Sequence, residues 1–210
     1  MYRFNSHYKP PYESEIEDIF AYNISKYLDQ NTELFSQHEV ETICGKYRID
    51  FVLKNNSTDF IAIECDGKKY HDKYRDEWRD AMILGSTSIA AIYRIKGSDI
   101  FYYINDVIFI FSKINPEFFS KRGLLNLSVI SSKQAKKLIV NKDDTMFLLN
   151  YLEKDSNAIY ELFIESRHKN IPKDKRQFWQ TLYAYALKNN GGLLDDIISK
   201  YRIENFTNIK

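Results

Sequence analysis

The chain has 210 residues, of which 44% are hydrophobic and 28% charged, with a net charge of +1. This composition is typical of a folded globular protein and excludes a disordered chain. Its two cysteines, Cys44 and Cys65, are too few for a disulfide framework or a cysteine-rich zinc site, so we expect a reducing, cytoplasmic compartment. No apolar run approaches the roughly 20 residues that span a bilayer, and residues 1–11 lack the apolar region of a signal peptide, so no membrane association is expected.

Residues 14–29 have the pattern of an amphipathic helix. Ser14 and Glu17 stand at the spacing of a capping box, in which the two side chains satisfy amides of the first helical turn. Apolar residues follow at helical spacing as far as Leu28. Capping is a sufficient explanation for Glu17, and a functional role for it stays open.

Three strands joined by short loops are predicted next, at 34–42, 47–53 and 59–66. Gly45-Lys46 and Asn55-Asn56-Ser57 are turn sequences between them. Because connections this short join antiparallel neighbours, we expect an antiparallel meander.

The third of these strands ends in two acids, Glu64 and Asp66. Alternate residues of a strand point to the same face, so these side chains share a face. Asp50 on the neighbouring strand is expected to lie beside them. Carboxylates this close repel each other and are costly to bury, whereas Mg²⁺ or Mn²⁺ binds such oxygen ligands readily. The pattern therefore predicts a divalent-cation site at this edge of the sheet.

An amphipathic helix over 70–84, a buried strand over 89–95 and a second helix from about 97 to 111 follow. Ser98 or Asp99 is the expected cap of that second helix. The order of elements up to residue 113 is then helix, three strands, helix, strand, helix.

Asn115-Pro116 is the predicted domain boundary, and the region 116–210 is predicted to be a mostly helical domain. We expect a short strand over 124–130, and helices at 132–139, 143–153, 156–168, 174–189 and 193–201.

This C-terminal region has 16 Lys and Arg against 11 Asp and Glu, whereas the rest of the chain has 14 against 18. Lys133, Lys136 and Lys137 are candidate phosphate contacts, although solubility is the simpler explanation of such lysines. A protein partner, or self-association through this region, is a further expectation.

An ordered set of residues resembles the PD-(D/E)XK nuclease superfamily, and more narrowly its branch of very-short-patch repair endonucleases and their relatives. The set extends over about 12–113 and contains Glu17, Asp50, Glu64-x-Asp66-Gly67, His71, Arg75-Asp76-x-x-Arg79-Asp80 and Tyr93-Arg94. The resemblance implies an α/β fold with a restriction-endonuclease-like α-β-β-β-α-β core in residues 1–115. It also implies a Mg²⁺-dependent endonuclease that hydrolyses phosphodiester bonds in nucleic acid, with DNA favoured.

The metal ligands are implied by the same resemblance. Asp50 matches the central metal-binding aspartate of the superfamily, and Glu64 matches the first acid of the (D/E)xK motif. Glu17 matches the acid of the first helix, which often contacts the metal through water. A bound Mg²⁺ or Mn²⁺ is therefore expected at Asp50, Glu64 and Glu17.

The third motif position departs from the superfamily, because Asp66 stands where a lysine is usual. Asp66, Lys68 and His71 all remain candidates for the group that activates water. Lys68 and Lys69 are also candidate contacts to nucleic-acid phosphates.

The missing lysine supports a second hypothesis, a nuclease-like subunit that binds nucleic acid or a partner protein without turnover. A carboxylate–metal enzyme acting on small phosphorylated substrates is a third, and it is the weakest because the chain has no Gly-rich phosphate loop. Structural roles also explain single residues. Asp50 can form a surface ion pair with Arg48 or Lys46, and Asp66-Gly67 can form a turn. Arg75 to Asp80 can form a solvent-facing ladder of ion pairs.

Overall fold

The computed structural model describes residues 7–56, 60–67, 72–141, 144–152, 159–169 and 179–206. Its strands are β1 (Glu33–Thr42), β2 (Gly45–Lys54), β3 (Phe60–Asp66), β4 (Ile89–Lys96), β5 (Met146–Leu152) and β6 (Ile159–His168). Its α-helices are α1 (Glu15–Ile24), α2 (Lys73–Ser86), α3 (Gly97–Ile114), α4 (Lys121–Ile130), α5 (Lys133–Lys137), α6 (Trp179–Lys188) and α7 (Leu194–Phe206).

The six strands form one mixed sheet in the order β1-β2-β3-β4-β6-β5. The first three strands are an antiparallel meander, as predicted. β3 and β4 are parallel, and α2 makes the crossover that a parallel pair requires. The remaining pairs, β4 with β6 and β6 with β5, are antiparallel.

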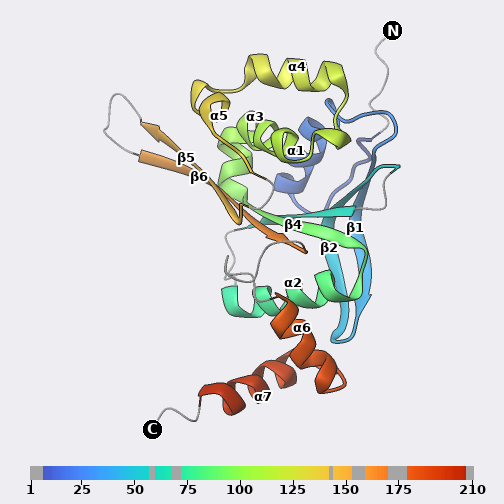
Figure 1. Ribbon diagram of the computed structural model, residues 1–210. Coiled ribbons are helices and arrows are strands. Elements are labelled where there is room, and N and C mark those ends of the chain that lie inside the picture. Colours follow the sequence, from blue (N-terminus) through green and yellow to red (C-terminus); the bar gives the residue numbers. More distant parts are fainter. Residues whose placement is uncertain are drawn as a thin grey trace.

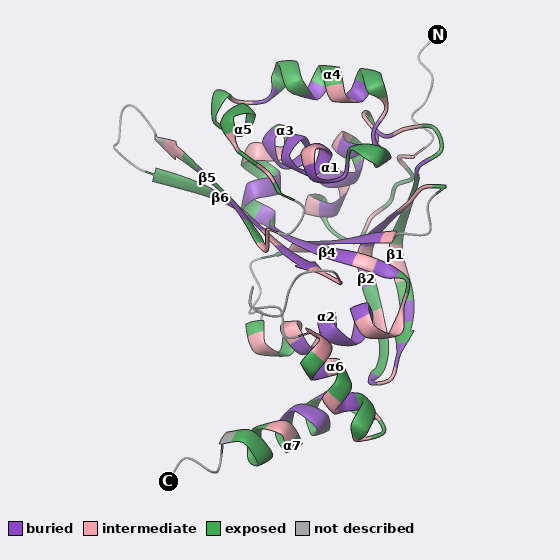
Figure 2. Cartoon of the chain, viewed as in Figure 1, coloured by how far each residue is buried: buried purple, intermediate pink, exposed green. Residues whose placement is uncertain are grey.

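Helices cover both faces of the sheet (Figure 1). α1, α3, α4 and α5 lie on one side, and α2, α6 and α7 on the other. The strands alternate accordingly, since Ile63 and Tyr93 join the core under α3 while Ala62 and Ile92 join the core under α2. Figure 2 shows the burial concentrated in α3 and the central strands. The fold is therefore a three-layer α/β arrangement.

The order of elements through α3 is confirmed, and so is the capping of α1. The Glu17 amide donates to Ser14 Oγ at 3.2 Å. The predicted cap of α3 is wrong, because Lys96 precedes that helix and makes no side-chain cap bond. Asp99 instead accepts from the Phe163 amide at 2.8 Å, and so ties α3 to β6.

The C-terminal prediction needs correction. In the described residues of 143–153 and 156–168 the structure has strands in place of the predicted helices, and β5 pairs antiparallel with β6 there. β6 pairs with β4 and buries Leu162 and Ile164 against the main core. The predicted strand over 124–130 is wrong too, because those residues belong to α4, where Ser120 Oγ accepts from the Gly123 amide at 3.0 Å.

The remaining C-terminal helices, α5, α6 and α7, lie where helices are predicted. The region after residue 115 is thus helical in part, and its hairpin extends the sheet of the first half. In the part of the chain that the structure describes, no helix is both long and apolar enough to cross a membrane.

Candidate functional site

Asp50 lies where the pairing of β2 with β3 gives way to a side-chain contact. The paired residues run from Lys54 and Phe60 to Phe51 and Ile63. At the next step the Cys65 amide donates to Asp50 Oδ2 at 2.7 Å. The Asp50 carboxylate therefore accepts a bond that a backbone carbonyl accepts elsewhere in the ladder. This bond holds the carboxylate in one orientation where the pairing of β2 with β3 ends.

Burial and neighbouring acids set the charge of this carboxylate. Burial is the main reason why the pKa of Asp50 is raised, and the nearby charge of Glu17 raises it further. The Cys65 amide and the Arg79 guanidinium oppose this shift. The ionised form of Asp50 is thus left partly uncompensated, which is the condition that a bound cation would relieve.

Glu64 lies next to Asp50 and is only 6% exposed. Burial raises the pKa of Glu64 to about 8, and the charge of Asp50 adds to this, although Arg79 lowers it. Arg79 Nη2 lies 2.7 Å from Glu64 Oε1 and also donates to the Arg48 carbonyl at 2.8 Å. Arg79 therefore links β2 and β3 and fixes the direction of the Glu64 side chain.

Glu17 is buried at the start of α1, and both of its oxygens accept hydrogen bonds. The Ser14 hydroxyl donates to Oε1 at 2.8 Å, and the Gln37 amide donates to Oε2 at 2.6 Å. Gln37 has a φ of 50° within β1, a left-handed conformation that is uncommon for a residue with a side chain. Each oxygen of Glu17 thus has one donor, and each keeps a further lone pair for another ligand.

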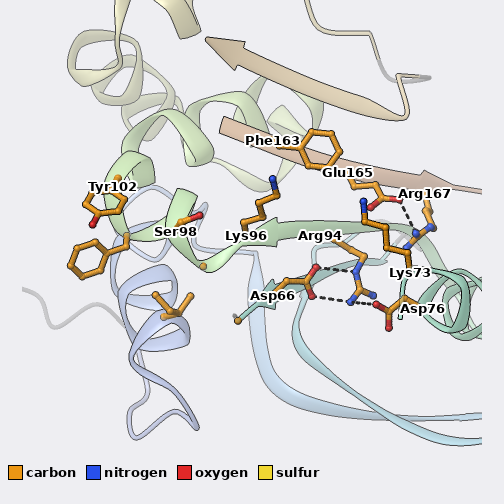
Figure 3. Close-up of a pocket in the computed structure, with 14 residues that line it drawn as sticks. Asp66, Lys73, Asp76, Arg94, Lys96, Ser98, Tyr102, Phe163, Glu165 and Arg167 are labelled. Atoms are coloured by element: carbon orange, nitrogen blue, oxygen red, sulfur yellow. Dashed lines mark hydrogen bonds and ion pairs between the residues drawn. The ribbon is translucent and has the colours of Figure 1, made fainter. Parts of the chain in front are cut away.

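Asp66 faces a different environment. Arg94 holds both of its oxygens, with Nη2 at 2.8 Å from Oδ1 and Nε at 3.1 Å from Oδ2. Arg94 also lies 3.4 Å from an oxygen of Asp76 (Figure 3), and 3.4 Å from one of Asp80. Asp66 is therefore engaged by an arginine rather than directed toward Asp50 and Glu64.

Asp80 completes this second group and is 0% exposed. It forms ion pairs with Arg94 and with Arg167, and Arg167 also lies 2.7 Å from Glu165 on β6. The buried network joins β3, α2, β4 and β6. The solvent-facing ladder considered for Arg75 to Asp80 is thus wrong for Asp80, which lies in the interior, and for Arg79, whose side chain is only 14% exposed.

The other predicted site residues are placed as follows. Lys68, Lys69 and His71 lie outside the described residues. The lysines at 133, 136 and 137 lie on or at the end of α5, which packs against β5 and α3, and Lys136 Nζ donates to the Val129 carbonyl at 3.0 Å.

Sequence analysis named Arg79 and Arg94 only as part of the resemblance and did not single out Arg167, so it missed that these arginines face the acids. The signal available for them was the position of charged residues among apolar ones. Asp80 is followed directly by Ala81 and Met82 of the helix core, and Arg94 lies within the apolar run of β4. A charge at such a position has to be paired when the element is covered on both sides.

The acids test the fit of the implied metal. Within the described ranges, no group of three His, Cys, Asp or Glu side chains converges on one point. Mg²⁺ is usually bound by only one or two carboxylates, with waters and substrate phosphates as the other ligands. Asp50 uses Oδ2 and Glu64 uses Oε1 in the contacts described above, so each carboxylate has a second oxygen for a cation. The Asp50–Glu64 pair therefore fits a two-carboxylate site.

No protein-family model, curated protein or solved structure matches this chain. The resemblance to the PD-(D/E)XK superfamily thus stays a prediction, and the arrangement of the side chains is what bears on function.

Proposed function

We propose that the chain is a Mg²⁺- or Mn²⁺-dependent nuclease that hydrolyses phosphodiester bonds in nucleic acid, with DNA favoured. The observation that carries this proposal is the partly buried Asp50 carboxylate, held by the Cys65 amide, whose charge acts on a buried acid, Glu64. A pair of desolvated acids without full compensation costs stability. A cation bound between the two acids would offset this loss of stability.

The residues have separate roles in this proposal. Asp50 and Glu64 would hold the cation, which would supply polarisation of the phosphate and stabilisation of the leaving oxygen. Arg79 fixes the direction of Glu64. Because Arg94 engages both oxygens of Asp66, Asp66 is disfavoured as the group that accepts the proton from water. Lys68 and His71 are the better candidates for that role.

Cleavage of nucleic acid tests the proposal. Purified protein is incubated with plasmid, duplex, single-stranded DNA and RNA in the presence of Mg²⁺ or Mn²⁺. We expect Asp50→Asn and Glu64→Gln each to lower the rate at least about 100-fold, because each removes a ligand whose loss costs several kcal/mol of transition-state stabilisation.

Asp195→Asn is the matched control, since that side chain is 71% exposed on α7. Its cleavage should equal that of the wild type. An absence of cleavage on all four substrates, or cleavage that survives both acid substitutions, would reject the nuclease.

A second candidate is a nuclease-like subunit that binds nucleic acid without turnover. It is favoured by the arginines that already face two of the acids, Arg79 at Glu64 and Arg94 at Asp66. Salt-dependent binding of nucleic acid by a protein with no affinity for Mn²⁺ would support this candidate over the enzyme.

A further inference from the structure

A cavity of about 850 Å³ lies beside the Asp66 end of β3 (Figure 3). Its walls come from the ends of β3 and β4, the first turns of α2 and α3, α1 and β6. This volume falls within the roughly 300–1,000 Å³ of sites that bind small molecules and cofactors. Because Asp66 is two residues from Glu64 on the same strand, the cavity adjoins the proposed cleavage site.

One end of the cavity is aromatic. Phe101 and Tyr102 project from the first turns of α3 and are 53% and 73% exposed. Their ring centroids are 5.0 Å apart, and the rings meet edge to face. Phe163 of β6 lies on another wall. Exposed rings beside a cavity offer stacking surfaces, and stacking on a nucleic-acid base tolerates any sequence because every base has a π-face.

The rest of the cavity is charged. Its three acids, Asp66, Asp76 and Glu165, are each paired with Arg94 or Arg167. Lys73 and Lys96 also line the cavity, and among the described residues neither forms an ion pair with a carboxylate. Lys96 Nζ lies 5.2 Å from the centroid of the Phe163 ring. The acids of the lining are thus held by the arginines, and these two lysines are cations available to an anionic ligand.

Both kinds of side chain line the same cavity. Phe101 and Tyr102 offer aromatic faces, and Lys73 and Lys96 offer ammonium groups. Aromatic faces and lysine side chains around one space are the combination that binds a nucleoside phosphate.

We propose that this cavity binds one unpaired nucleotide of a nucleic-acid strand, with its base against Phe101 and Tyr102 and its phosphate at Lys73 and Lys96. The choice of a strand as ligand rests on the proposed nuclease function, and the cavity narrows the substrate to one with unpaired nucleotides. A base inside an intact duplex is stacked on both sides, so it has to leave the helix before it can enter.

Fluorescence anisotropy of a short labelled oligothymidylate tests the proposal, in EDTA so that no cleavage occurs. We expect the single strand to bind more tightly than a duplex of the same length. Phe101→Ala and Tyr102→Ala should each weaken binding by about 5- to 100-fold. Tyr102→Phe should retain the wild-type affinity, because it keeps the ring. Lys73→Gln and Lys96→Gln should each lower the slope of log K against log salt by about 0.7.

Phe35→Ala is the matched control, because Phe35 is an exposed ring on β1, away from the cavity. It should bind as the wild type does, and thermal melting confirms that each variant is folded. Wild-type affinity in both alanine variants would overturn the proposal. So would equal binding of duplex and single strand, or binding of thymidine monophosphate as tight as that of the oligonucleotide. Since the assay contains no metal, failure of the nuclease function would leave its result intact.

Discussion

Two groups of acids meet at β3, one from β2 and β3 and the other from β3 and α2, yet they differ in their partners. Asp50 is partly buried and Glu64 is buried, their charges repel, and the guanidinium in contact with Glu64 is that of Arg79. Asp66 and Asp80 face two guanidinium groups, those of Arg94 and Arg167. Each acid of the second group is thus held by a guanidinium, whereas the Asp50 carboxylate is held by a backbone amide.

This difference in partners shows that a position at the end of a strand does not decide whether an acid is available to a ligand. Glu64 and Asp66 are two residues apart on β3. Their neighbours on α2 and β4 decide the outcome, because Arg94 takes both oxygens of Asp66 while Arg79 takes one oxygen of Glu64. We therefore expect the two groups to respond differently to substitution, one in stability and the other in metal binding.

The largest effect on stability is expected at Asp80. Asp80→Ala removes the buried acid that joins Arg94 to Arg167 and leaves each arginine only its less buried partners. Removing one partner of a buried ion pair costs about 3–5 kcal/mol. Urea denaturation followed by circular dichroism measures the loss. A cost below 1 kcal/mol, within the range of an exposed ion pair, would show that the network does not stabilise the fold.

A smaller and pH-dependent effect is expected at Glu64. The folded-state pKa of about 8 is above the ordinary value of 4.5, so folding favours the protonated carboxyl. This contribution to stability is fully present below pH 4.5 and is lost as the pH rises through about 8. Glu64→Gln cannot ionise, so without metal it should melt close to the wild type at pH 5 and above it at pH 9.

Each kcal/mol corresponds to about 2–4 °C in Tm for a chain of this size. Scanning calorimetry at the two pH values measures the difference. The same gap in Tm at pH 5 and pH 9 would contradict the burial of an uncompensated Glu64.

The smallest effect is expected at the surface. Arg75 Nε lies 2.9 Å from Asp195 Oδ1, and both side chains are exposed. Arg75→Ala should cost about 0–1 kcal/mol by urea denaturation, because water screens an exposed pair. A loss as large as that of Asp80→Ala would mean that the pair fixes α7 against α2 far more strongly than its exposure suggests.

The first half of the fold could be predicted because its signals are local. The capping box at Ser14, the turn at Gly45-Lys46 and the helical period of α2 each lie within a few residues. β6 could not be placed this way, because its partner β4 is about 70 residues away in the sequence, and β5 pairs with β6. The β-branched and aromatic residues around Leu162 and Ile164 were the available sign of a strand.

The acids of the candidate site could be predicted from their pattern, but their partners could not. Whether Arg79 and Asp80 face water depends on what covers α2. α6 packs so closely on this helix that a Cβ at Gly85 would lie 2.2 Å from the Tyr183 ring. The sheet covers one side of α2 and α6 covers the other, so charged side chains on α2 are enclosed. The local sequence pattern of α2 does not indicate that α6 packs on it.

Calorimetric titration with Mn²⁺ above pH 8, where Glu64 is ionised, tests the central claim most directly. The claim is that Asp50 and Glu64 hold a divalent cation whereas Asp66 does not. We expect the wild type and Asp66→Asn to bind Mn²⁺, and Asp50→Asn and Glu64→Gln to lose that binding. A wild type that binds no Mn²⁺, or an Asp50→Asn variant that binds it as the wild type does, would contradict the claim.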